Sequence, residues 1–167
     1  MNEFLIPAEK YRYQAQTAHY LRYAVAFVDL DGLKRINDTL GHETGDRALI
    51  EAASVLKESF RQSDVLGRLS GDEFSVFISH TDENEASGIR QRVQQHLDTC
   101  NAQSGRQYSL CLSIGIVSGS SVDNVTIEAL LKQADALMYE QNVPKPITKN
   151  TQPRPARKQK RQWPEED

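Results

Sequence analysis

Cysteine is scarce in this chain, and its spacing excludes several classes of protein. The only two cysteines, Cys100 and Cys111, are isolated and lack the spacing of a metal-ligand set or a redox pair. Two isolated cysteines also cannot form the framework of a disulfide-stabilised secreted domain. We therefore expect two reduced thiols, as in a cytosolic protein.

Long apolar runs are also missing. The longest, "YAVAFV" and "SIGIV", have the length of strands, well below the roughly 18 residues of a membrane helix. The opening "MNEFLIPAEK" lacks the basic-then-apolar layout of a secretion signal. We expect a cytoplasmic protein without a membrane span.

The net charge of −3 is unevenly distributed. From Pro144 onward the chain carries seven Lys or Arg and three acids, which leaves 13 basic and 20 acidic residues in the rest. A negative body argues against nucleic-acid binding by the folded part. The proline-rich, charged segment 144–167 predicts a disordered basic tail. Its "RKQKRQ" run is typical of a solvated basic tail, or could contact anions or nucleic acid.

Periodicity predicts one domain over 23–143, preceded by a helical segment over 1–22. The expected strands are 23–30, 65–69, 74–79 and 108–119, and the expected helices are 33–40, 46–60, 84–99 and 126–142. The two middle strands form a hairpin, which makes at least part of the sheet antiparallel. The predicted fold class is α/β (α+β), with a mostly antiparallel central sheet flanked by helices.

Two acid clusters stand at the ends of predicted strands. In "RLSGDEFSVFIS" the tip of the hairpin carries Asp72 and Glu73, and the first strand ends with Asp29 and Asp31. Crowded carboxylates repel one another unless a cation reverses the interaction. Mg²⁺ prefers such hard oxygen ligands together with phosphate. If the first strand neighbours the hairpin, Asp29 and Asp72 should converge on one cation.

The segment between these clusters offers groups suited to a nucleotide. Lys34 can neutralise phosphate, and Asn37 and Asp46 offer donors and acceptors for a purine edge. Each also has a structural interpretation: Asn37 could cap a turn, Asp46 could cap the following helix, and His42 could be a loop histidine. Together with the acids, they indicate a nucleoside triphosphate pocket.

"DLDGLKRINDTLGHETGD" (29–46) followed by "SGDEF" (70–74) resembles the GGDEF domain of diguanylate cyclases. The resemblance implies a palm-like fold related to nucleotide cyclases and polymerases, and condensation of two GTP into cyclic di-GMP and pyrophosphate by a homodimer. It also implies Mg²⁺ (or Mn²⁺) as cofactor. Carried over by position, the implied roles are metal binding by Asp29, the Leu30 carbonyl and Asp72; catalysis by Asp72 and Glu73; and substrate binding by Lys34, Asn37, His42, Asp46 and Gly71.

"RQSD" (61–64) lies five residues before Ser70 and is similar to the family's RxxD inhibitory site. Arg61 suits a phosphate or a guanine edge, and Asp64 suits guanine N–H groups. The resemblance implies product binding there. The structural alternative is a charged turn between a helix and a strand.

The sequence departs from the family pattern at several positions. Ser70 replaces the first glycine of the motif, which would cost about 1 kcal/mol if that position required a left-handed backbone. Asn142 stands where the family has a phosphate-contacting Lys, Pro146 where it has a second base, and the usual opening motif is absent.

Three hypotheses follow: an active diguanylate cyclase, a catalytically inactive GGDEF module that binds GTP or cyclic di-GMP as a regulator, and a domain that only contacts a partner.

Overall fold

The computed structural model describes residues 22–81, 83–102, 105–120 and 125–142. The predicted helical segment over 1–22 and the predicted tail over 144–167 lie outside the described residues. One exception is Arg22, which the structure places in the first strand rather than in a helix.

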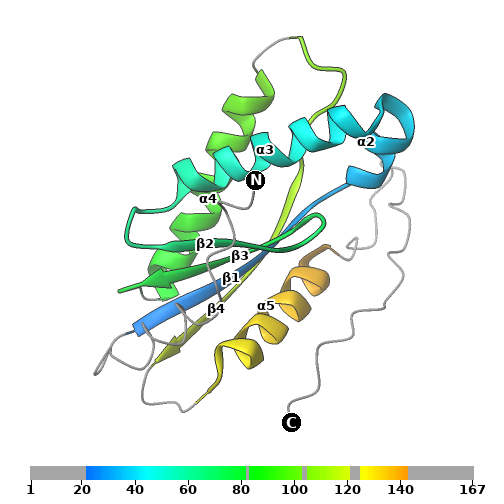
Figure 1. Ribbon diagram of the computed structural model, residues 1–167. Helices are drawn as coiled ribbons and strands as arrows, with labels where there is room; N and C mark the ends of the chain where they lie inside the picture. Colours follow the sequence, from blue (N-terminus) through cyan, green and yellow to red (C-terminus); the bar gives the residue numbers. More distant parts are fainter. Residues whose placement is uncertain (1–21, 82, 103–104, 121–124, 143–167) are drawn as a thin grey trace, which may run out of the picture.

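Four strands and four helices follow one another in a β-α-α-β-β-α-β-α order (Figure 1). They are β1 (Arg22–Leu30), α2 (Leu33–Leu40), α3 (His42–Ser59), β2 (Val65–Ser70), β3 (Glu73–Ser79), α4 (Glu83–Ala102), β4 (Leu112–Ser120) and α5 (Ile127–Asn142). The sheet order is β2-β3-β1-β4, and every neighbouring pair is antiparallel. The predicted α+β class with an antiparallel sheet is confirmed.

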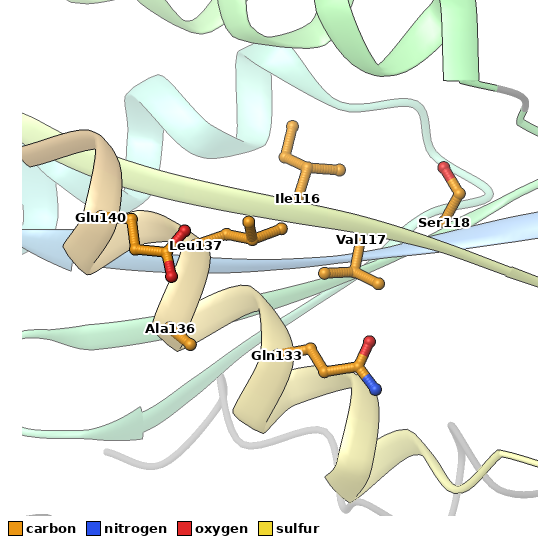
Figure 2. A pocket seen from close by; sticks show the side chains of 7 residues that line it. All are labelled: Ile116, Val117, Ser118, Gln133, Ala136, Leu137 and Glu140. Atoms are coloured by element: carbon orange, nitrogen blue, oxygen red, sulfur yellow. The ribbon is translucent and has the colours of Figure 1, made fainter.

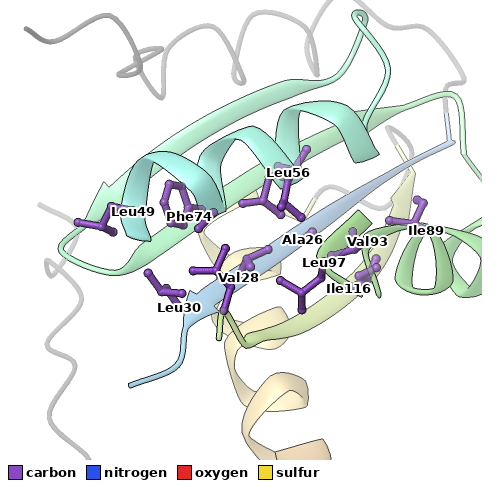
Figure 3. Close-up of a cluster of buried hydrophobic side chains, with 14 of the residues drawn as sticks. Ala26, Val28, Leu30, Leu49, Leu56, Phe74, Ile89, Val93, Leu97 and Ile116 are labelled. Carbon is purple, nitrogen blue, oxygen red and sulfur yellow. The ribbon is translucent and has the colours of Figure 1, made fainter. Parts of the chain in front are cut away.

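Strand β1 lies in the middle of the molecule and is covered on both faces. Its apolar residues alternate between two clusters, so Val28 packs with α3 and α4 (Figure 3) whereas Phe27 packs with α5. Figure 1 shows α3 and α4 on one side of the sheet and α5 on the other. Strand β3 shares this two-sided burial, because all five residues from Phe74 to Ile78 are buried. The strand therefore does not alternate between core and solvent.

Two predicted starts were wrong by four residues, each for a local reason, while the other boundaries differ by three residues or fewer. Helix α3 begins at His42 instead of Asp46, because Gly41 adopts a φ of 86° and lets a new helix start directly after α2. Strand β4 begins at Leu112 instead of 108, because the Asn101 side chain bonds both backbone groups of Leu110 at 2.8 Å. An amide side chain thus replaces a neighbouring strand there.

Helix α5 approaches β4 closely and runs antiparallel to it. A Cβ on Gly119 would meet Leu130, whereas a Cβ on Gly115 would meet the backbone of Ala134 and Met138. The C-terminal end of α5 is therefore directed toward the start of β4. That start pairs with the end of β1, where Asp29 lies.

Two of the helices, α3 with 18 residues and α4 with 20, have the length to cross a membrane. Within the described parts of the chain, however, no helix combines that length with enough apolar character to do so.

Candidate functional site: an acid cluster at one end of the sheet

Three carboxylates from two strands and a turn converge at one end of the sheet. Oxygens of Asp29, Asp72 and Glu73 all lie within 4.8 Å of one another. The register explains this arrangement, because Asp29 is paired with Glu73 across β1 and β3 and the Leu30 N–H donates to the Asp72 carbonyl at 2.9 Å. The structure therefore brings Asp29 and Asp72 together, as the sequence led us to expect.

The burial of this cluster matters for its chemistry. Asp29 is only 1% exposed, while Asp72 and Glu73 are half-buried. Removing a carboxylate from water costs free energy, and neighbouring negative charges add to that cost. A divalent cation would offset both contributions and leave the open side of the cluster for phosphate oxygens. The residues present therefore fit an Mg²⁺ or Mn²⁺ ion.

The hairpin turn is shaped by three residues around the acids. Gly71 adopts a φ of 39°, whereas Ser70 does not adopt a positive φ. The serine at the first motif position therefore carries none of the left-handed strain considered above. Its hydroxyl instead donates to Glu73 Oε2 at 2.9 Å, and Arg68 donates twice to the Gly71 carbonyl, at 2.6 and 3.0 Å. These bonds orient the second acid and fix the turn.

The elbow between α2 and α3 gathers the predicted base-reading residues. Asn37 lies directly against α3, since a Cβ on the buried Gly45 would come 1.7 Å from Asn37 Oδ1. Asp46 is the next residue along α3 and is exposed. Because α3 starts at His42, Asp46 is not the helix N-cap, which removes that structural interpretation. Asn37 and Asp46 therefore lie on either side of the connection between α2 and α3.

Two further predicted residues flank the elbow. Lys34 is exposed on the first turn of α2, and His42 is exposed as the first residue of α3. Figure 1 shows α2 at the same end of the sheet as the tip of the β2–β3 hairpin. The elbow and the acid cluster therefore lie at one end of the molecule.

The "RQSD" segment lies at the other end of the hairpin, since six residues of β2 separate it from the tip, roughly 20 Å. The Asp64 carboxylate accepts the backbone N–H groups of Arg61 at 2.8 Å and Ser79 at 3.3 Å. Arg61 forms an exposed ion pair with Glu85 at 3.3 Å. Exposed pairs contribute about 0–1 kcal/mol, so an anion could compete for this guanidinium.

A hollow between β4 and α5 is separate from all these residues (Figure 2). It is lined by Ile116, Val117, Ser118, Gln133, Ala136, Leu137 and Glu140. None of Asp29, Asp72 and Glu73 lines it, and its lining includes no basic side chain. We assign the site to the acid cluster and not to this hollow.

A second polar cluster ties α3 to the segment that leads into β4. Glu51 accepts bonds from Arg106 at 2.6 Å and from the Tyr108 hydroxyl at 2.9 Å. Burial raises the pKa of Tyr108, and the hydrogen bond to Glu51 adds to the increase. These bonds hold the segment before β4 against α3, and we assign the cluster a structural role.

Three residues were missed by sequence reasoning. Arg68 holds the hairpin turn, and Gly45 leaves space for Asn37. Ser113 is a buried serine paired with Asp29 across β1 and β4. Ser113 could have been noticed as a polar residue inside the apolar run "CLSIGIV". The contact between Gly45 and Asn37 has no comparable signal, because it depends on how two helices pack.

The chain is similar in sequence to several known proteins. The chain is 39% identical to the cyclic di-GMP phosphodiesterase NbdA of Pseudomonas aeruginosa over 117 residues, covering 70% of this chain and 15% of NbdA. It is 31% identical to diguanylate cyclase A of Treponema denticola, covering 70% of this chain and 32% of that protein. The chain thus spans a third or less of the length of each of these two relatives.

A solved structure shares the fold. It is described as a microbial GGDEF domain interacting with cyclic di-GMP, is 27% identical and has a TM-score of 0.65, with 80% of each chain covered. The sequence profile described as "Diguanylate cyclase, GGDEF domain" matches residues 7–144. The acid cluster, the order of the strands and this match lead to one conclusion: the chain belongs to the GGDEF domain family.

Proposed function

We propose that this protein is a diguanylate cyclase, which joins two GTP molecules into cyclic di-GMP and releases pyrophosphate. The observation that carries the proposal is the convergence of Asp29, Asp72 and Glu73 within 4.8 Å. We place the activity in the cytoplasm. The name of diguanylate cyclase A and the description of the matching profile support this reaction class, whereas NbdA is named a cyclic di-GMP phosphodiesterase. Because the chain covers only part of these relatives, neither name identifies a pathway.

Asp29, the Leu30 carbonyl and Asp72 would hold Mg²⁺ or Mn²⁺. When bound, the cation neutralises charge on the phosphates and lowers the pKa of an oxygen bound to it. Glu73, oriented by Ser70, lies beside Asp72 and would accept the proton of the attacking 3′-hydroxyl. Lys34 would contribute positive charge to the phosphates, and the exposed Gly71 lets them approach the turn.

The chemistry is an in-line phosphoryl transfer. The 3′-oxygen of one GTP loses its proton and forms a bond to the α-phosphorus of the other, while the bond from that phosphorus to the bridging oxygen of the β-phosphate breaks and pyrophosphate leaves. The same step in the opposite direction closes the ring and releases a second pyrophosphate. Each domain would hold one GTP, so two copies of the chain must face each other with twofold symmetry. Positioning and charge neutralisation supply most of the rate in such transfers.

Guanine selection is assigned to the elbow between α2 and α3. Asp46 would accept the guanine N–H groups, Asn37 would bond the neighbouring acceptor, and His42 would lie beside the pocket. A site that bonds these edges rejects adenine, because adenine would leave Asp46 and Asn37 unpaired.

We also propose that cyclic di-GMP inhibits the protein at Arg61 and Asp64. The weak exposed pair between Arg61 and Glu85 supports this role, because a phosphate could replace Glu85. The Asp64 carboxylate already bonds two backbone N–H groups, so binding through its oxygens would require sharing or exchanging those bonds.

Incubation of the purified chain with GTP and Mg²⁺, with product detection by mass spectrometry, tests the proposal. We expect cyclic di-GMP from the unsubstituted chain and at least a thousandfold less from Asp72→Ala. Asp98→Ala, which removes an exposed acid from α4, is the matched control and should retain activity. Absence of product at high protein concentration would refute a cyclase.

A second candidate is a GGDEF module that binds GTP or cyclic di-GMP without turnover. The observation that favours it is Asn142, the last residue of α5, at the position of the family's Lys. It predicts saturable binding of either nucleotide without product, and loss of cyclic di-GMP binding in Arg61→Ala.

A further inference from the structure

The turn at the end of β1 is held by contacts that the roles above do not use. The Asp31 N–H donates to the Cys111 carbonyl at 2.9 Å, and Asp31 Oδ2 accepts a hydrogen bond from Ser113 Oγ at 2.7 Å. Ser113 lies on β4 opposite Asp29 and is only 4% exposed. The end of β1 is therefore bonded to the start of β4.

These bonds fix the orientation of the Leu30 carbonyl. In a trans peptide, the C=O of Leu30 and the N–H of Asp31 point in opposite directions. Since the N–H points at β4, the carbonyl points to the other side of β1, where β3 lies. The Leu30 N–H points to that side as well, because it donates to the Asp72 carbonyl.

The Leu30 side chain adds a third restraint, because it is fully buried against α3 and its neighbours (Figure 3). The residue is thus held by its side chain, by its own N–H and by the following N–H. A carbonyl held this way is directed toward the side of Asp72 and Glu73 before any ligand arrives.

We propose that Asp31 and Ser113 are positioning residues that lock the peptide between Leu30 and Asp31, so that the Leu30 carbonyl faces the cation. This inference rests on the proposed function. Ser113 needs only an acceptor at position 31, and an amide oxygen accepts this hydrogen bond as a carboxylate does. The described acids whose oxygens converge within 4.8 Å are Asp29, Asp72 and Glu73, and Asp31 is not among them.

The test separates positioning from ligation by comparing Ser113→Ala, Asp31→Ala and Asp31→Asn. The probe is Mn²⁺ with a non-hydrolysable GTP analogue, followed by electron paramagnetic resonance. We expect Ser113→Ala and Asp31→Ala to weaken Mn²⁺ binding about tenfold, the loss typical of one such bond. Asp31→Asn should lose less than threefold, because its amide oxygen accepts the same hydrogen bond.

A second readout needs no nucleotide. Amide hydrogen exchange of residue 31 in the unliganded chain reports whether its N–H remains bonded. Protection should fall about tenfold in Ser113→Ala and Asp31→Ala and be retained in Asp31→Asn. Ser118→Ala on the same strand is the matched control and should change neither measurement.

Two outcomes would overturn the inference. Unchanged binding and protection in Ser113→Ala and Asp31→Ala would show that the lock does nothing. Loss of Mn²⁺ in Asp31→Asn as large as in Asp29→Asn, with normal binding by Ser113→Ala, would make Asp31 a direct ligand. If the unsubstituted chain binds no Mn²⁺ with the analogue, the proposed function fails and the cation role fails with it, whereas lost protection in Ser113→Ala would still support the locked peptide.

Discussion

Residues with small side chains determine where the larger functional groups lie. Gly45 leaves room on α3 for Asn37, and Ser70 orients Glu73 without left-handed strain. The chemistry assigned to this domain therefore depends on side chains that would not contact the nucleotide. Substitutions at such positions should change function more than stability.

Gly45→Ala tests this separation. The added Cβ would lie 1.7 Å from Asn37 Oδ1, and the end of that side chain can rotate away. The helix gains about 1 kcal/mol from the better helix former, so the unfolding midpoint should hold or rise. The KM for GTP should rise about tenfold, through loss of a guanine contact.

Gly88→Ala is the matched control, since Gly88 lies in α4 and a Cβ there would meet nothing within 4 Å. It should stabilise the chain similarly and leave the KM unchanged. An unchanged KM in Gly45→Ala would contradict the assignment of Asn37 to guanine.

At the scale of single residues, the acids of the site could be predicted from the sequence, whereas the residues that hold the site in place could not. Asp29, Asp72 and Glu73 stand at strand ends that the sequence displays, so their convergence could be inferred. Ser113 acts on Asp31 from 82 residues away, and that contact depends on the pairing of β1 with β4. No local pattern reports it.

At the scale of elements, strand and helix types followed from periodicity, whereas two boundaries depended on single residues. Gly41 permits α3 to start four residues early, and Asn101 replaces a strand partner before β4. The first depends on a backbone conformation and the second on a bond from a side chain to the backbone. The hydrophobic pattern of the sequence indicates neither. The close packing of α5 on β4 at Gly115 is likewise a tertiary feature.

Gly115→Ala should destabilise the domain. Its Cβ would lie 1.8 Å from the Ala134 carbonyl oxygen, and this backbone atom cannot rotate away. Overpacking of this kind costs about 1–3 kcal/mol, measured as the free energy of unfolding in urea. Ser118→Ala on the same strand should cost much less, and equal stability of the two variants would show that α5 is loosely packed.

Asn142→Lys should strengthen GTP binding. Helix α5 ends at this residue and is directed toward the end of the sheet that carries Asp29. A lysine at this position would add positive charge at the negative end of the helix dipole and at the end of the sheet where we propose that the phosphates bind. One charge-assisted bond is worth about 1.5–3 kcal/mol, so the KM should fall at least tenfold. Asn142→Gln should have no effect, and a lysine variant no better than glutamine would place the phosphates elsewhere.

At the scale of the whole molecule, the antiparallel sheet places its site at one end and the "RQSD" segment about one strand length away. Substrate and product would thus bind at separate places on one rigid hairpin. The overall class was predictable because strands covered on both faces carry long apolar runs, as β1 does from Tyr23 to Val28. The proposed pairing of two copies around two GTP molecules would be a property of the assembly, so no single element could predict it.

Crystals grown with Mn²⁺ and a non-hydrolysable GTP analogue give the most direct test of the central claim, through the anomalous signal of the metal. We predict a peak within about 2.5 Å of carboxylate oxygens of both Asp29 and Asp72, next to the triphosphate. A triphosphate bound at the hollow between β4 and α5, or an anomalous peak away from these two acids, would contradict it.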